Sequence, residues 1–165
     1  MALTIETGAG VAGANSYVSV VNAQTWVTAR GIAVTVTEAL LLKAMDYLEA
    51  LRAEYQGVKV SSDQALQWPR YDVYVDGYPL DSDVIPATLI SAQCQLACDA
   101  YTMDLLPSGD GREVIKESMV MGLVSKEYSP GSGGAALPHL RAADAFLAPL
   151  LKSAVGGGYI FTERV

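Results

Sequence analysis

The spacing of apolar residues predicts helices in the first half of the chain. An apolar stripe after Ser19 ends before Gly31, so we expect a helix of about eleven residues that Ser19 caps. A second stripe, rich in leucine, predicts a helix from Thr37 to about Glu54. The Gly-rich residues 1–16 have no such stripe and are expected to form an extended arm on the surface.

A third helix is predicted from Ile85 to Leu106, with Pro86 in its first turn. Stepping about 100° per residue divides its apolar residues between two opposite faces. Such a helix must be covered twice, either as the central helix of a bundle or partly by a neighbouring protomer. One face carries Ile85, Leu89, Ala92, Leu96 and Met103, and the other carries Ile90, Cys94, Ala97, Cys98, Tyr101 and Leu105.

Strand-forming residues follow the third helix. Residues 113–128, with Met121-Gly122 at their centre, predict a β-hairpin that needs a partner surface. A linker rich in glycine and serine comes next, and a fourth helix is expected from about His139 to Lys152.

Together these patterns predict a mainly α fold. The four helices are expected to form a four-helix bundle-like domain over residues 1–155, with a long loop, the hairpin and extended N- and C-terminal arms. Residues 156–165 are the expected C-terminal tail. The chain has 165 residues, of which 51% are hydrophobic, and this suits one domain with a real core. Only 18% are charged, which favours burial of apolar surface between subunits.

The most unusual stretch is Gln64–Arg70, which reads Gln-Ala-Leu-Gln-Trp-Pro-Arg within a loop of roughly thirty residues. A large aromatic, a rigid proline and a planar cation are rare in a connecting segment and indicate an anchored contact. In one interpretation Trp68 fills a groove between the second and third helices while Arg70 pairs with a loop aspartate. In the others this segment contacts another subunit, or it stacks on single-stranded bases beside three loop tyrosines, Tyr71, Tyr74 and Tyr78.

The charge of the chain bears on nucleic-acid binding. The net charge is −7 and the sequence pI is about 4.5, whereas tight binding to a phosphate backbone uses clustered lysine and arginine. The basic residues are scattered, and none precedes Arg30. Electrostatic steering toward DNA is therefore not expected.

Neither a signal peptide nor a membrane span is expected. The first residues lack a basic and an apolar region, and no run approaches the ~20 apolar residues that cross a bilayer. The chain is thus expected to stay in a cytosolic compartment. Cys94 and Cys98 have no second cysteine pair, and His139 is the single histidine, so we expect buried reduced thiols rather than a zinc site.

Candidate chemistry for an enzyme is weak. Residues Gly8–Gly13 match Gly-x-Gly-x-x-Gly literally, but no buried strand precedes them, so a nucleotide site is disfavoured. The loop aspartates fit no standard calcium loop and predict a solvated acidic surface instead: Asp72, Asp76, Asp81 and Asp83. We expect no catalysis, no cofactor and no metal.

The predicted tail carries large apolar residues directly after three glycines. Tyr159-Ile160-Phe161 either folds back on the bundle or extends to the sheet edge or groove of a partner, and the glycines favour reach.

The order of these features resembles a known family. The arm Glu6–Tyr17, the segment Ala44–Leu48, and Ser62–Arg70 followed by Asp76-Gly77 and Ile85-Pro86 are similar to tailed-bacteriophage head–tail adaptor, or head-completion, proteins. That family is often labelled putative DnaT-like single-stranded-DNA-binding protein. The resemblance covers roughly residues 5–107, and its Gln-x-Leu-x-Trp-Pro-Arg run is specific.

The resemblance implies a structural virion protein of the phage neck, assembled in the host cytoplasm. Its subunits would form a homo-oligomeric ring, typically a dodecamer, that binds the portal protein and the next neck or tail-completion protein. Genomic double-stranded DNA would pass through the channel without specific binding, and an acidic protein suits that role. No membrane is involved.

Two sets of site residues follow from this interpretation. The portal interface would be the tail, namely Tyr159, Ile160, Phe161, Thr162, Glu163, Arg164 and Val165. The internal brace or subunit interface would comprise Trp68, Pro69, Arg70, Met119, Met121, Cys94, Cys98 and Tyr101. The alternative function is a replication accessory that binds single-stranded DNA through the loop aromatics, and the charge favours the adaptor over it.

Overall fold

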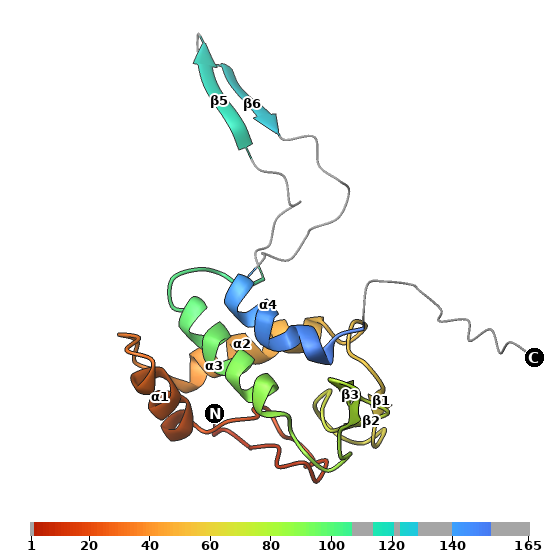
Figure 1. The fold of residues 1–165 in the computed structure, drawn as a ribbon. Helices are drawn as coiled ribbons and strands as arrows, with labels where there is room; N and C mark the ends of the chain where they lie inside the picture. The colour runs from red at the N-terminus through yellow and green to blue at the C-terminus, as the bar shows by residue number, and fades with distance from the viewer. Residues whose placement is uncertain (1, 107–113, 121–122, 129–139, 153–165) are drawn as a thin grey trace, which may run out of the picture.

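The computed structural model describes residues 2–106, 114–120, 123–128 and 140–152 (Figure 1). Its helices are α1 (Val20–Ala29), α2 (Glu38–Ala50), α3 (Ala87–Asp99) and α4 (Arg141–Leu147), and the 3₁₀ turn η1 (Ala148–Leu150) follows α4 directly. Its strands are β1 (Val58–Lys59), β2 (Arg70–Tyr71), β3 (Tyr74–Val75), β4 (Tyr78–Pro79), β5 (Val114–Val120) and β6 (Leu123–Tyr128).

The expectation of a mainly α, four-helix bundle-like domain is wrong. The described residues form a small mixed α/β domain, in which β1 pairs with β2, β3 with β4 and β5 with β6, each pair antiparallel. The loop expected between the second and third helices contains the first two pairs. Strands of two residues are too short to show the period-2 pattern from which a strand is predicted. In addition, α4 spans only 7 residues, because Pro149 turns the chain into η1.

The predicted starts of the first two helices are confirmed. The Ser19 hydroxyl accepts a hydrogen bond from the Asn22 backbone N–H, and the Thr37 hydroxyl accepts one from Leu40. Each cap satisfies a backbone donor that the first helical turn leaves free. Both α2 and α3 end earlier than expected. After α2 the chain turns, and Tyr55 forms a β-bridge with Leu151.

The central position in the helical body belongs to α3, which packs against α1, α2 and α4 (Figure 1). Both of its predicted apolar faces are buried along the helix proper, one around Leu89 and Leu96 and the other around Cys94 and Ala97. Tyr101 lies beyond the helix end and is 64% exposed. The other helices of the same chain therefore supply the double cover that the sequence requires.

The N-terminal residues differ from the expected surface arm. Glu6 and Ser16 are buried, and the link to the core is Gln93, a fully buried residue of α3. The side-chain Oε1 of Gln93 accepts the Tyr17 backbone N–H at 3.0 Å, while its Nε2 donates to Ser16 Oγ at 2.8 Å and to the Leu41 carbonyl at 3.3 Å. One amide thus joins the arm, α2 and α3.

The hairpin of β5 and β6 has the predicted location. Met119 pairs with Val124 and Val120 with Leu123, with a register irregularity between Val114 and Lys116. The expected turn at Met121-Gly122 lies outside the described residues. Among the described helices, none is long and apolar enough to cross a membrane.

We predict that Gln93→Leu lowers the free energy of unfolding by about 2–4 kcal/mol, because it leaves the buried Tyr17 N–H without an acceptor. Urea unfolding followed by circular dichroism measures the change. The matched control is Gln95→Leu on the same helix, which removes only a half-buried bond to Asp99 and should cost less than ~1 kcal/mol. Equal losses in the two variants would contradict the role of Gln93.

Candidate functional site

The run Gln64–Arg70 packs into the core of its own chain. Trp68 has no exposed surface, and its ring meets that of Tyr55 edge to face, with centroids 5.9 Å apart. Its backbone N–H donates to the buried Tyr17 hydroxyl at 3.2 Å. The indole Nε1 is buried and has no acceptor among the residues that the structure describes. Trp68 is therefore a core residue and is not available to stack on a ligand.

The guanidinium of Arg70 is the cation of this core. Only 6% of the residue is exposed, and its Nε and Nη2 donate to the carbonyls of Gln56 and Gly57 at 2.6 and 2.7 Å. Its Nη1 donates to Gln67. These acceptors are carbonyl and amide oxygens rather than the loop aspartate considered from the sequence. Burial lowers the pKa of Arg70.

Two further side chains fix the shape of the run. The carboxylate of Glu49 in α2 accepts both the backbone N–H and the side-chain Nε2 of Gln67, each at 3.0 Å. The buried Gln64 donates from Nε2 to the carbonyls of Leu66 and Pro69 at 2.9 Å. These bonds satisfy the polar side chains of Gln64 and Gln67 on both sides of the run and fix its backbone.

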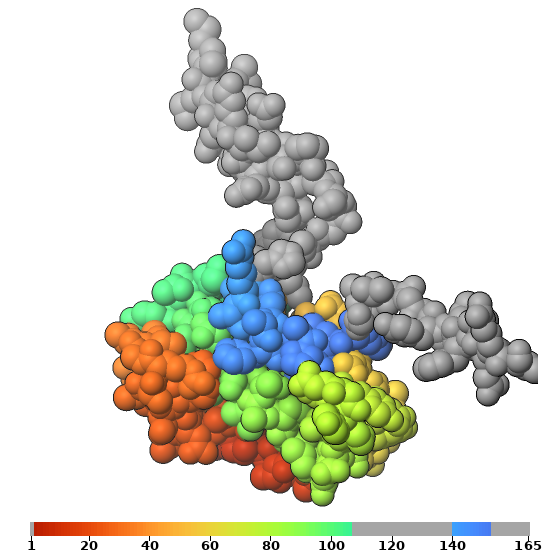
Figure 2. All heavy atoms as spheres, in the orientation of Figure 1, coloured from red at the N-terminus to blue at the C-terminus, as the bar shows by residue number. Residues whose placement is uncertain are grey.

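This core-packed run positions a group of exposed tyrosines. Directly after Arg70, Tyr71, Tyr74 and Tyr78 are 45%, 55% and 76% exposed. Their backbone is held by Gln56, whose Oε1 accepts the Tyr74 N–H at 3.3 Å, and by the Leu80 N–H, which donates to Val73 at 2.9 Å. In Figure 2 the yellow-green segment that contains residues 71–78 lies at the edge of the helical body.

The strand register shows how the tyrosines are arranged. Tyr71 pairs with Val58, which is 47% exposed, so these two side chains share one side of β1–β2. Tyr74 pairs with Pro79, and Val75 pairs with Tyr78. Because successive residues of a strand point to opposite sides, Tyr74 and Tyr78 lie on opposite sides of β3–β4. The three rings therefore do not form one flat surface.

The electrostatics around these tyrosines are acidic. Residues 57–84 hold two cations, Lys59 and Arg70, and the second is buried. Lys59 itself donates from Nζ to the Gln64 carbonyl at 2.9 Å. The same residues contain five aspartates, namely Asp63, Asp72, Asp76, Asp81 and Asp83. Phosphate pairing can contribute little here, and any affinity for a nucleic acid must come from the rings.

The Gly-rich run near the N-terminus already holds an anion, the buried carboxylate of Glu6. Its Oε1 accepts the N–H groups of Gly8 and Gly10 at 2.9 and 3.0 Å, and its Oε2 accepts that of Val11 at 2.7 Å. Converging backbone N–H groups of this kind form an anion-binding nest. The donors that a nucleotide phosphate would need are therefore in use. Among the described residues, no group of three His, Cys, Asp or Glu is arranged to hold a metal ion.

The predicted site residues do not come together in one place. Trp68 and Arg70 lie beside Tyr55, whereas Cys94 and Cys98 are buried in α3 and Tyr101 is exposed beyond it. Burial raises the pKa of the Cys94 thiol to about 12, so the thiol is unreactive. Met119 lies in β5, and Met121 and residues 159–165 are outside the described residues.

The polar side chains that build the site were missed at the sequence level. The hydrogen bonds of these side chains join residues 14 to 51 positions apart, namely those of Gln56, Glu49 and Tyr17. No local spacing in the sequence predicts contacts of that range. Only Glu6 had a usable signal, since an acid two residues before a Gly-rich run is a candidate for the anion of that run.

The sequence was compared with protein-family models, curated proteins and solved structures, and one family matches. The sequence model of the family described as "Putative DnaT-like ssDNA binding protein" matches residues 1–165. The chain belongs to this family. No curated protein and no solved structure matches it.

This match corrects the identification as a phage head–tail adaptor. The family covers the whole chain under a single-stranded-DNA-binding description, and nothing in the comparisons indicates an adaptor. The portal partner, the ring and the place in a virion neck were implied by that resemblance alone and lose their support with it. The family description supports the replication-accessory alternative instead.

We predict that Arg70→Lys lowers the free energy of unfolding by about 2–3 kcal/mol, because an ammonium group cannot serve the three carbonyls that the planar fork reaches. Urea unfolding measures the loss. Arg52→Lys, at an exposed site near the end of α2, is the matched control and should change stability by less than ~0.5 kcal/mol. An Arg70→Lys protein as stable as the control would refute the brace.

Stability should fall as the pH rises above about 9. Burial raises the folded-state pKa of Cys94 to about 12 and also raises those of Tyr17 and Tyr55. Below about pH 8.5, the unfolded pKa of a thiol, Cys94 keeps its proton in both the folded and the unfolded state. Above that pH only the folded state keeps it, so the free energy of unfolding falls by up to ~1.4 kcal/mol per pH unit for each such group. Cys94→Ala should flatten the decline between pH 9 and 10, measured by urea unfolding. A wild-type stability that is constant up to pH 10.5 would contradict this.

Proposed function

We propose that this protein binds single-stranded DNA by stacking unpaired bases on the tyrosines of residues 71–78. The observation that carries the proposal is the exposure of Tyr71, Tyr74 and Tyr78 on a backbone held in place by Gln56 and Arg70. An aromatic ring left in water has unused apolar area, and an unpaired base is a flat group that can cover it. The family description supports the same ligand.

The arrangement of the rings favours a single strand over a duplex. Tyr74 and Tyr78 lie on opposite sides of β3–β4, so successive bases must turn in different directions to meet them. The unstacked bases of a flexible single strand can do this, whereas those of a duplex are stacked on each other. The ligand class is therefore unpaired nucleotides with little dependence on sequence, because every base has a π-face.

The acidic surroundings predict an unusual salt dependence. With Lys59 as the one cation of residues 57–84 that is not buried, the logarithm of the binding constant should fall with the logarithm of salt with a slope of only about −0.7. Binding should thus be weak but retained at salt concentrations that dissociate proteins with basic grooves.

We predict that Tyr74→Ala and Tyr78→Ala each weaken binding about 5- to 150-fold, since stacking on an aromatic side chain contributes ~1–3 kcal/mol per base. Fluorescence anisotropy of a labelled oligothymidylate of about 20 nucleotides measures the affinity. The matched control is Tyr101→Ala, which removes another exposed tyrosine, far from β2–β4 in the sequence, and should leave the affinity unchanged.

Two outcomes would refute the proposal. One is the absence of any anisotropy change with wild-type protein at tens of micromolar and low salt. The other is an equal loss of affinity in Tyr101→Ala and Tyr74→Ala, which would place binding elsewhere. A duplex of the same length should bind more weakly than the single strand.

A further inference from the structure

An uncharged surface lies on one side of the strand pair β1–β2. Val58 pairs with Tyr71 in the register, so their side chains share this side, and they are 47% and 45% exposed. Val60, two residues after Val58, is also 47% exposed. Between the two valines Lys59 is half-buried, and its Nζ donates to the Gln64 carbonyl. We call Val58, Val60 and Tyr71 the β1–β2 face.

The position of this face is fixed at Gly57. A Cβ there would overlap the Tyr71 carbonyl oxygen, so glycine is what lets the two segments approach so closely. Gly57 also has a φ of 60°, a conformation that favours glycine. Its carbonyl accepts a hydrogen bond from Nη2 of the buried Arg70 at 2.7 Å. The β1–β2 face is therefore a preformed surface of the domain.

The chain leaves the described body close to the start of β1. The Lys152 backbone N–H donates to the Glu54 carbonyl at 2.7 Å, and Leu151 forms its β-bridge with Tyr55. The residues after Lys152 therefore start beside Glu54, which precedes Val58 by four residues in the sequence.

An apolar segment follows within reach of this face. Tyr159-Ile160-Phe161 comes directly after three glycines. The seven residues from Lys152 to Tyr159 span up to ~25 Å when extended, and a flexible Gly-rich chain of that length averages about 15 Å. The four residues from Glu54 to Val58 span at most ~14 Å. The apolar segment can therefore reach the β1–β2 face without being stretched.

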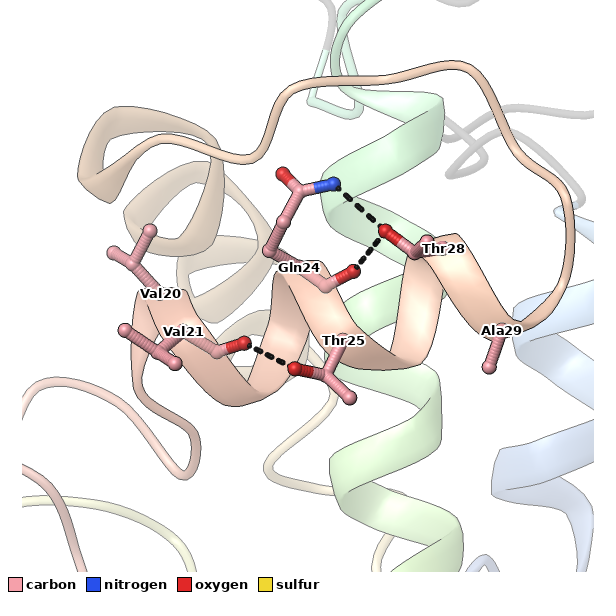
Figure 3. Close-up of a pocket in the computed structure, with 6 residues that line it drawn as sticks. All are labelled: Val20, Val21, Gln24, Thr25, Thr28 and Ala29. Carbon is pink, nitrogen blue, oxygen red and sulfur yellow. Dashed lines mark hydrogen bonds between the residues drawn. The ribbon is translucent and has the colours of Figure 1, made fainter.

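Another exposed apolar surface is the outer face of α1. Val21 there is 74% exposed, and Figure 3 shows it among the side chains that line a hollow. Half of that lining is polar, namely Gln24, Thr25 and Thr28. The described hydrogen bonds of residues 149–152 lead to residues 53–56, beside β1. Because a tethered segment has its highest effective concentration near its attachment point, the β1–β2 face is favoured over α1.

We propose that Tyr159–Phe161 binds the β1–β2 face of the same chain and covers its three apolar side chains. The contact is intramolecular, so it forms at the effective concentration that the short linker sets, about millimolar, rather than at the concentration of the protein. It does not depend on DNA binding. A consequence that rests on the proposed function is that a base must displace the segment to stack on Tyr71, whereas the tyrosines of β3–β4 stay open.

Nuclear magnetic resonance relaxation of the isotopically labelled full chain tests whether the segment is ordered. Ile160 and Phe161 should have backbone order parameters above about 0.6, the value below which a backbone counts as flexible. Val58→Asp places a charge on the β1–β2 face and should lower both order parameters below that value. The matched control is Val21→Asp, the same substitution at an exposed valine of α1, which should leave both unchanged.

The reciprocal variant is Ile160→Asp. It should shift the amide resonances of Val58 and Tyr71 and leave that of Val21 in place, because it uncovers the β1–β2 face alone. Circular dichroism verifies that each variant is folded. A segment that is flexible in the wild-type protein overturns the proposal. So does order that survives Val58→Asp, which would place the segment elsewhere, and order that is lost on dilution, which would indicate a second copy.

Discussion

The loop between α2 and α3 is organised by the hydrogen bonds of one buried cation, the guanidinium of Arg70. A charged group removed from water is costly unless it is hydrogen-bonded, and here the acceptors are carbonyls on both sides of the loop, at Gln56, Gly57 and Gln67. These residues can converge only if the loop closes on itself. That closure sets Lys59 opposite Arg70 in β1–β2 and directs Tyr71 outward.

Because Arg70 is buried, the exposed groups near it are aromatic rings rather than a cation. The cation that stands out in the sequence as a contact for phosphate or carboxylate is consumed inside the fold. Under the proposed function, an acidic chain in a family described by single-stranded DNA binding holds the polyanion through its exposed tyrosines. Stacking depends little on salt and on base identity, whereas binding in a basic groove weakens as salt rises.

Whether a feature can be predicted from the sequence depends on how far apart in the chain its interacting residues lie. The caps at Ser19 and Thr37 act over three residues, and both helix starts are confirmed. The double burial of α3 follows from its own periodicity. The contacts of Gln93 with Ser16 and Tyr17 span more than 70 residues, and nothing near either end indicates them, so the arm was misplaced on the surface.

The strands β1–β4 were missed for a different reason, because each has only two residues and shows no alternation. The Arg70 contacts with Gln56 and Gly57 hold β1–β2 together, whereas Asp76 and Gly77, both at positive φ, form the tight turn of β3–β4. The error over the adaptor family has a related origin. The run Gln-x-Leu-x-Trp-Pro-Arg specifies how a loop packs, and a packing motif identifies a fold without identifying its partner.

The side chain of Gln56 links two parts of the chain that are far apart in the sequence. Its Nε2 donates to the carbonyls of Pro149 and Leu151, and its Oε1 accepts the backbone N–H of Tyr74. One amide therefore connects the end of η1 directly to the strand pair that carries Tyr74 and Tyr78. A ligand that orders Tyr74 would therefore also order Leu151 through Gln56, and any event that orders Leu151 would favour that ligand to the same extent.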